Sequence, residues 1–159
     1  MATAEENDKE ARRTNIVLYR VPESTEASAT DRTVEDNRFC LQLFSKMEVG
    51  IVEEDIRKVT HLGKRDVSAT AGPRPILVQF ANRMAKNLVM ESLYKLKNLE
   101  AKFNTVIVTH DMTRKEREDC KNLVEEAKAK TAQDPSGEWI YRVRGSPGKF
   151  QIIQFKRRY

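Results

Sequence analysis

The sequence predicts an α+β fold in which two helices cover one face of a four-stranded antiparallel sheet. The central observation is the run 74–80, where Ile76, Val78 and Phe80 recur with the two-residue period of a strand that buries one face. Two stretches of helical period and three further strand-like runs surround it. Those runs occupy residues 15–21, 56–62 and 105–109. The order strand, helix, strand, strand, helix, strand is that of the ferredoxin-like plait (βαββαβ).

Residues 1–13 hold no Val, Ile, Leu or aromatic side chain, so we expect either a disordered end or the tail of an upstream coiled coil. Residues 23–31 are rich in Ser, Thr and Ala and are predicted to form an exposed loop. The first helix is predicted to start near Thr33 and to end before Gly50. Its expected buried face comprises Phe39, Cys40, Leu43, Phe44 and Met47.

The second half of the plait, which is predicted to span residues 14–111, follows the same logic. Residues 63–73 are predicted to form a flexible and partly basic hairpin loop. Asn82 is expected to cap the second helix, because an Asn side chain accepts from free backbone N–H groups there. The expected buried face of that helix comprises Ala85, Leu88, Val89, Leu93 and Leu96.

A small C-terminal lobe of one helix and a β-hairpin is predicted for residues 112–159. Thr113 and Glu116 have the spacing of a capping box at the start of the helix. Strands at 138–144 and 149–156 are predicted to flank a four-residue loop, so that Arg144 faces Lys149 and Arg142 faces Gln151. The opposite face of the hairpin is apolar and is expected to pack. It carries Trp139, Tyr141, Val143, Phe150 and Ile152.

The positive charge of the chain is local to its C-terminal segment. The 159 residues carry a formal net charge of +5, with 33% charged residues. Residues 139–159 contain no Asp or Glu but six basic side chains: Arg142, Arg144, Lys149, Lys156, Arg157 and Arg158. A basic field beside aromatic residues favours a polyanionic partner, most often nucleic acid.

Several other classes of function lack support in the sequence. No apolar run approaches the length of a membrane span, so no membrane partner is expected. The two cysteines and two histidines have no metal-ligand spacing, which predicts no metal site and suggests reduced thiols. No glycine-rich loop or nucleophile motif is present, so we expect neither a cofactor nor enzymatic activity.

Three pieces of the sequence resemble one known family. They are residues 12–23, His61-Leu62-Gly63 followed by residues 73–80, and the helix opening at 113–117. Together they resemble the RNA-binding region, an RRM-like domain plus a C-terminal domain, of the first open reading frame protein of LINE-type retrotransposons (the transposase-22 family). The resemblance covers roughly residues 12–155. One departure is His61, which stands where members of the family often have an arginine.

The resemblance implies a nucleic acid chaperone that coats single-stranded RNA, and also binds single-stranded DNA, during transposition. It implies a cytoplasmic ribonucleoprotein, with the nucleus as a further location. Family members form trimers through an upstream coiled coil. Because residues 1–13 have no apolar heptad, we expect this chain by itself to be a monomer.

The candidate nucleic-acid-binding residues are mainly basic, since phosphate contacts dominate binding that has little sequence preference. Aligning the strands with those of RNA-recognition domains leaves only Tyr19 as an aromatic side chain in a base-stacking position. The complete set is Arg12, Arg13, Tyr19, Arg20, His61, Lys64, Arg65, Arg74, Arg142, Arg144 and Lys149.

Other interpretations remain open at this point. Plait domains also serve as protein-interaction modules, and a small hydrolase of the acylphosphatase type shares the plait. The hydrolase requires a glycine-rich phosphate-binding loop after the first strand, and residues 22–31 contain no glycine. Arg74 is equally compatible with a surface ion pair, and the basic residues of the C-terminal segment with a solvated surface.

Overall fold

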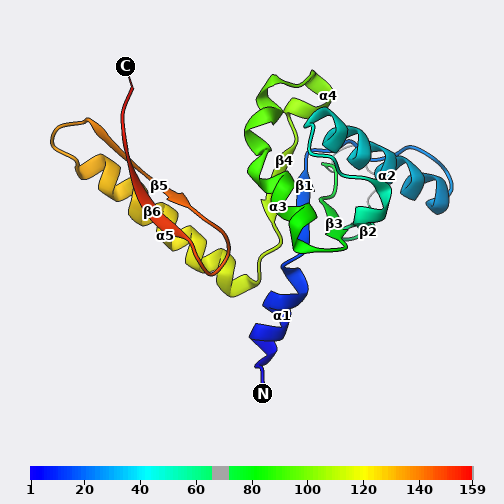
Figure 1. The fold of residues 1–159 in the computed structure, drawn as a ribbon, viewed down its shortest axis with the longest axis horizontal. Coiled ribbons are helices and arrows are strands. Elements are labelled where there is room, and N and C mark those ends of the chain that lie inside the picture. Colours follow the sequence, from blue (N-terminus) through cyan, green and yellow to red (C-terminus); the bar gives the residue numbers. More distant parts are fainter. Residues whose placement is uncertain (66–71, 159) are drawn as a thin grey trace. The chain divides into compact units, whose positions relative to one another are not determined.

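The computed structural model describes residues 1–65 and 72–158, so the predicted loop at 63–73 lies partly outside the described residues. The chain forms two compact units, which are described separately below (Figure 1). The sheet unit comprises Ala11–Asp111, and the hairpin unit comprises Met1–Glu10 together with Met112–Tyr159. The first ten residues therefore group with the C-terminal part of the chain, a relationship that the sequence did not indicate.

The sheet unit is built on four antiparallel strands in the order β2-β3-β1-β4. The strands are β1 (Asn15–Tyr19), β2 (Ile56–His61), β3 (Ile76–Phe80) and β4 (Ile107–His110). The first and third strands are central, as predicted. The last strand begins two residues later than predicted because a short helix, α4 (Ala101–Asn104), and its C-cap Thr105 precede it.

One face of the sheet forms the core. Ile16 and Leu18 of β1 pair with Val78 and Ile76 of β3, and all four side chains are fully buried. Buried residues of α2 (Ala29–Lys46) and α3 (Arg83–Glu91) belong to the same hydrophobic cluster, so both helices lie on this one face. The alternating burial pattern of β3 follows directly from the two-residue period of its sequence.

Helix α2, which corresponds to the first helix predicted from the sequence, begins earlier than predicted. Helix α2 starts at Ala29 because Ser28 is its N-cap and accepts a hydrogen bond from the Asp31 backbone N–H at 3.3 Å. The predicted start near Thr33 was therefore wrong. The predicted buried face is confirmed, since Cys40, Leu43, Phe44 and Met47 are all 0% exposed and Phe39 packs against the core.

The second helix is capped as predicted but is shorter than expected. The Asn82 side chain accepts a hydrogen bond from the Ala85 N–H at 2.9 Å. The helix ends at Glu91, and a 3-10 helix, η2 (Leu93–Asn98), follows it. Because Ala85 and Val89 face the sheet, Leu88 turns outward and is 40% exposed, which corrects its predicted burial. A second 3-10 helix, η1 (Glu53–Asp55), precedes β2.

The hairpin unit contains helix α5 (Arg114–Gln133) and the strands β5 (Trp139–Arg144) and β6 (Gln151–Lys156). Helix α1 (Ala4–Arg12) begins in this unit. The predicted capping box is present: the Thr113 Oγ1 accepts from the Glu116 N–H at 3.1 Å, and the Glu116 carboxylate accepts from the Thr113 N–H at 3.2 Å. The Oγ1 hydroxyl of Thr113 also donates to Glu5 Oε1 at 2.7 Å, which anchors α1 within the unit.

The hairpin register differs from the prediction by two residues. Arg144 faces Gln151 and Arg142 faces Ile153, so the loop spans residues 145–150. The Lys149 N–H donates to the Ser146 carbonyl at 2.8 Å, which closes a turn inside the loop. A Cβ atom on Gly145, whose φ is +117°, would lie 2.6 Å from the Lys149 carbonyl oxygen. Because the shift is an even number of residues, the side chains of β5 and β6 keep their predicted faces. Lys149 and Phe150 were predicted to begin the second strand, but they lie in the loop.

Candidate nucleic-acid interface

The sheet face opposite the helices carries one aromatic ring among the described strand residues. Tyr19 at the end of β1 is 39% exposed and pairs with Ile107, which is 42% exposed. Beside them the pairing places Val17 between Leu77 and Thr109, and Val17 is only 4% exposed. This face therefore offers one stacking position at its end. At its centre the side chains of Val17, Leu77 and Thr109 pack together and offer no aromatic ring.

The strand register gathers several candidate residues at one end of the sheet. Leu18 and His61 both pair with Ile76, so the end of β1, the end of β2 and the start of β3 lie together. This places six of the predicted side chains in one region: Tyr19, Arg20, His61, Lys64, Arg65 and Arg74. Arg20 is exposed and has a φ of +66°, while the next residue, Val21, is 2% exposed in the core.

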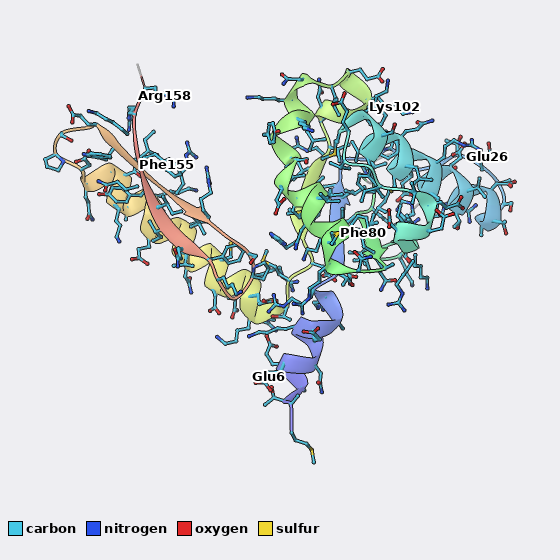
Figure 2. The ribbon with its side chains drawn as sticks, in the orientation of Figure 1. Glu6, Glu26, Phe80, Lys102, Phe155 and Arg158 are labelled. Carbon is cyan, nitrogen blue, oxygen red and sulfur yellow. The ribbon has the colours of Figure 1, made fainter. Side chains whose placement is uncertain are left out.

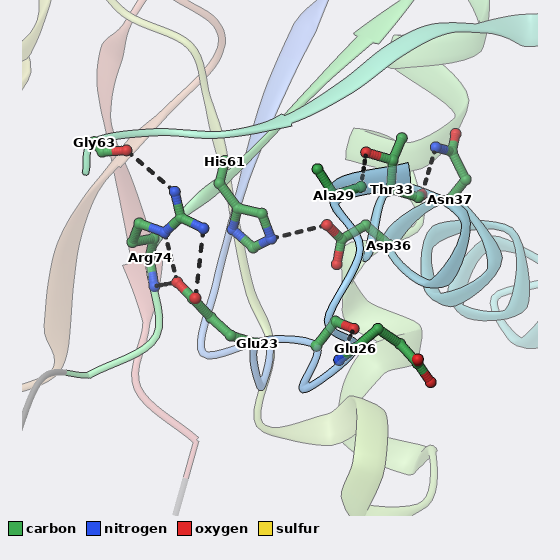
Figure 3. A network of polar contacts seen from close by, with 10 residues as sticks. Glu23, Glu26, Ala29, Thr33, Asp36, Asn37, His61, Gly63 and Arg74 are labelled. Atoms are coloured by element: carbon green, nitrogen blue, oxygen red, sulfur yellow. Dashed lines mark hydrogen bonds and ion pairs between the residues drawn. The ribbon is translucent and has the colours of Figure 1, made fainter. Parts of the chain in front are cut away.

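Arg74 is held by Glu23 (Figure 3). Its Nε donates to Glu23 Oε1 at 2.7 Å, its Nη2 to Oε2 at 3.4 Å, and its backbone N–H to Oε1 at 3.0 Å. Its Nη1 also donates to the Gly63 carbonyl at 3.2 Å. The side-chain hydrogen bond from Arg74 lowers the pKa of Glu23 against the opposing effect of burial. The surface ion pair that the sequence left open for Arg74 is thus present.

His61 lies on the helix side of the sheet and pairs with Asp36 of α2 (Figure 3). Its Nε2 is 2.8 Å from Asp36 Oδ2, and the two side chains are 12% and 9% exposed. Burial raises the pKa of Asp36, and the charge of His61 acts in the opposite direction. Burial also raises the pKa of the neighbouring Cys40 thiol to about 12, so this cysteine is a packing residue. The outer sheet face does not include His61.

The N-terminal arginines lie near the opposite end of β1. Arg12 Nη1 contacts Asp111 Oδ1 at 2.7 Å, and Asp111 Oδ2 accepts from Asn15 Nδ2 at 3.0 Å. Burial lowers the pKa of His110 to about 4, with further contributions from the charges of Lys86 and Arg13. The sequence did not reveal these contacts, because Arg12 and Asp111 are 99 positions apart.

The basic residues of the hairpin remain exposed to solvent. Arg142, Arg144 and Lys149 form no ion pair with a carboxylate of the described residues. The guanidinium carbon of Arg144 lies 5.3 Å from the ring centroid of Phe155, which is 40% exposed (Figure 2 labels Phe155). Phe155 was missed from the sequence, although it follows Ile153 by the two residues that put both on one face of β6.

No protein-family model matches the chain, and no curated protein matches it. Within residues 1–65 and 72–158, no helix is both long and apolar enough to cross a membrane. In the same ranges, no group of three His, Cys, Asp or Glu side chains is placed to hold a metal ion. The site is therefore interpreted from its own charge, exposure and geometry.

Proposed function

We propose that this chain binds single-stranded nucleic acid, RNA above all, with little sequence preference. The observation that carries the proposal is the basic surface of the hairpin unit. Arg142, Arg144 and Lys149 are exposed and form no ion pair with a described carboxylate, in a segment of the chain that contains no Asp or Glu. Phosphate groups are the ligands that such a surface favours, since they release condensed counterions when arginine and lysine neutralise them.

The arrangement of the sheet unit supports the same proposal. We interpret it as an RRM-like plait, because its strand order is β2-β3-β1-β4 and both long helices pack on one face. In RNA-recognition domains the opposite face meets the nucleic acid. Here that face offers Tyr19 for stacking, with Arg20, Lys64 and Arg65 exposed at the same end.

The mechanism consists of many weak contacts with phosphates. Each exposed cation exchanges between phosphates without reading the base, so strands can anneal and re-pair while they remain bound. This is the behaviour of a nucleic acid chaperone. Together with the sequence pieces at 12–23, 61–63, 73–80 and 113–117, it supports a role in the ribonucleoprotein of a LINE-type retrotransposon, with trimers formed only through a coiled coil.

A salt titration of binding to single-stranded RNA, single-stranded DNA and duplex tests the proposal. The logarithm of affinity for single strands should fall with the logarithm of salt concentration, with a slope of about −0.7 per phosphate contact. Changing Arg142, Arg144 and Lys149 together to Ala should flatten that slope by roughly 1.4–2.1 units, because about two to three contacts are lost. A triple variant that stays folded and keeps the parent slope contradicts the proposal.

Tyr19→Ala provides a second and different test. Stacking releases few ions, so this variant should weaken binding by about five- to tenfold with little change in the salt slope. Tyr94→Ala is a suitable control, since Tyr94 is 67% exposed and lies in η2 and not in a strand. Equal binding by Tyr19→Ala and the parent chain would remove the sheet face from the mechanism.

A second candidate function is a protein-interaction module. A surface groove of ≈ 860 Å³ runs along the exposed side of α2, where Val34 is 49% exposed, and reaches Phe103 of α4. A protein partner in this groove would bind with an affinity that hardly depends on the charges of the hairpin. Val34→Glu should then abolish the interaction and leave the binding of single-stranded RNA unchanged.

A further inference from the structure

The open face of the hairpin combines apolar and basic side chains. We call it the Phe155 face and define it by the cross-strand pairs Ile140–Phe155, Arg142–Ile153 and Arg144–Gln151. Ile153 and Phe155 are each 40% exposed, and Arg142, Arg144 and Gln151 are also exposed. Exposed large apolar side chains at adjacent pairs of one small sheet are unusual in a surface that meets only water.

The other face of the hairpin packs within the unit. It carries Trp139, Tyr141, Val143 and Ile152, which are all half-buried. The Tyr141 backbone N–H donates to Thr131 Oγ1 of α5 at 2.8 Å, so the helix fixes β5 in place. The apolar side chains of the Phe155 face are therefore not needed to pack the hairpin against its helix, and they are available for contact with a ligand.

The charge of the Phe155 face selects the kind of ligand. Between residues 139 and 159 the chain contains six Lys or Arg and no Asp or Glu. The guanidinium of Arg144 lies over the Phe155 ring, with its central carbon 5.3 Å from the ring centroid. A planar cation beside an exposed aromatic ring offers two surfaces on which a nucleobase can stack, and the cation can also reach a phosphate.

We infer that the Phe155 face is a base-stacking subsite for single-stranded nucleic acid. Phe155 supplies the stacking surface, Ile153 extends it, and Arg144 and Arg142 neutralise the adjoining phosphates. This inference deepens the proposed binding of single strands and rests on it. It adds a contact with the bases to a surface whose basic residues alone would contact only the backbone.

The ligand must be single-stranded, because the faces of bases inside a duplex are covered by their neighbours. A protein partner would need carboxylates opposite Arg142 and Arg144. The binding of such a protein partner would not depend on bases, so a competing strand would displace it equally well with or without them. The presence of bases in the ligand is therefore the variable that distinguishes these occupants.

The test compares two ligands with the full chain at one salt concentration. One is an oligouridylate, and the other is an abasic oligomer of the same length, which keeps the phosphates and lacks the bases. Phe155→Ala should weaken binding of the oligouridylate by about tenfold and leave binding of the abasic oligomer unchanged. Phe155→Trp should restore the affinity, and Tyr94→Ala, an exposed aromatic of the sheet unit, should have no effect. A thermal melt of each variant confirms that it is folded.

The possible results separate this inference from the proposed function. Equal losses on both ligands would assign Phe155 only to the positioning of Arg144 and would overturn the stacking subsite. If the parent chain binds both ligands with the expected salt dependence and Phe155→Ala changes neither affinity, the subsite is wrong while the proposed function stands. If the parent chain binds neither ligand, both are wrong. A concentration-dependent dimer that Phe155→Ala dissociates would identify the face as a contact between copies of the chain.

Discussion

Arg74 and Glu23 are joined by three hydrogen bonds, two from the guanidinium and one from the Arg74 backbone N–H, the shortest of 2.7 Å. The pair ties the residues that precede β3 to the segment that follows β1. The side chains are 19% and 23% exposed, so water screens the pair only in part. Arg74 thus has a structural role, which distinguishes it from the exposed lysine and arginine residues of the proposed binding surface.

Arg74→Ala should lower the free energy of unfolding by about 2 kcal/mol, because Glu23 is left half-buried without its partner. Urea denaturation near neutral pH measures this change. Arg74→Lys should recover only part of it, since an ammonium cannot make the two-point contact. If Arg74→Ala is as stable as the parent and instead flattens the salt slope of RNA binding, its principal partner is a phosphate.

The His61–Asp36 pair should also contribute to stability. His61→Ala leaves Asp36 buried and unpaired, so unfolding free energy near pH 7 should fall by roughly 2–3 kcal/mol. Without His61 the pKa of Asp36 should rise further, because only the groups that raise it remain. The folded variant then binds a proton on Asp36 more readily than the unfolded chain does. The loss of stability caused by His61→Ala should therefore become smaller as the pH is lowered towards 5.

A double-mutant cycle with Asp36→Asn measures how strongly the two side chains are coupled. The doubly substituted chain should be more stable than His61→Ala alone, because the neutral amide does not require a cation. Strict additivity of the two single substitutions would contradict a direct interaction between them.

His110 should make stability depend on pH in a defined window. Its pKa is lowered from 6.5 to about 4 in the folded protein, chiefly by burial. As the pH falls, the unfolded chain therefore binds a proton on His110 before the folded protein does. The contribution of this group to the free energy of unfolding is fully present above pH 6.5 and is lost as the pH drops towards 4. The loss should be roughly 1–2 kcal/mol, which is less than the full shift implies because the side chain is partly exposed.

Chemical denaturation between pH 7 and pH 5 tests this effect before most carboxylates titrate. His110→Gln should flatten the dependence on pH in that interval. Glu23 contributes at lower pH, since its depressed pKa makes its stabilisation disappear only as the pH falls below about 4.5. A parent and a variant with the same slope would show that another group controls stability there.

Thr113 joins the start of α5 to helix α1. It is 1% exposed, accepts from the Glu116 N–H and donates to Glu5. Thr113→Ala should cost about 1–2 kcal/mol and should increase hydrogen exchange of the first turns of α5 and α1. Thr113→Ser keeps the hydroxyl and is the matched control. Unchanged exchange in α1 would indicate that Glu5 is not held by this contact.

Local patterns in the sequence were sufficient to predict which segments form strands and most of the buried helix faces, although β4 and β6 each begin two residues later than predicted. Ile76, Val78 and Phe80 alternate because the pleat itself alternates, and a capping box such as Thr113-x-x-Glu116 is contained in four residues. The start of α2 was missed because several Ser and Thr residues precede it, and only the folded segment selects Ser28 as the cap. There the Arg32 guanidinium donates to the carbonyls of residues 26 and 27.

The contacts that shape the candidate site were less predictable, because they join distant positions. Arg74 and Glu23 are 51 residues apart, so nothing local identifies which carboxylate an arginine will meet. The hairpin register was missed because a loop of Gly, Ser and Pro fits four or six residues equally well. The outcome depends on a close backbone approach between Gly145 and Lys149, which appears only after folding.

That close approach also sets how freely position 145 of the hairpin loop can vary as sequences diverge. Gly137, which lies between α5 and β5, provides the contrast. At Gly137 the φ of +67° lies in the left-handed region that Asn and Asp tolerate, and a side chain there would meet no atom within 4 Å. At Gly145 both the φ of +117° and the Lys149 carbonyl exclude any side chain. A library randomised at both positions and selected for folding should therefore retain several residues at the first position and glycine alone at the second.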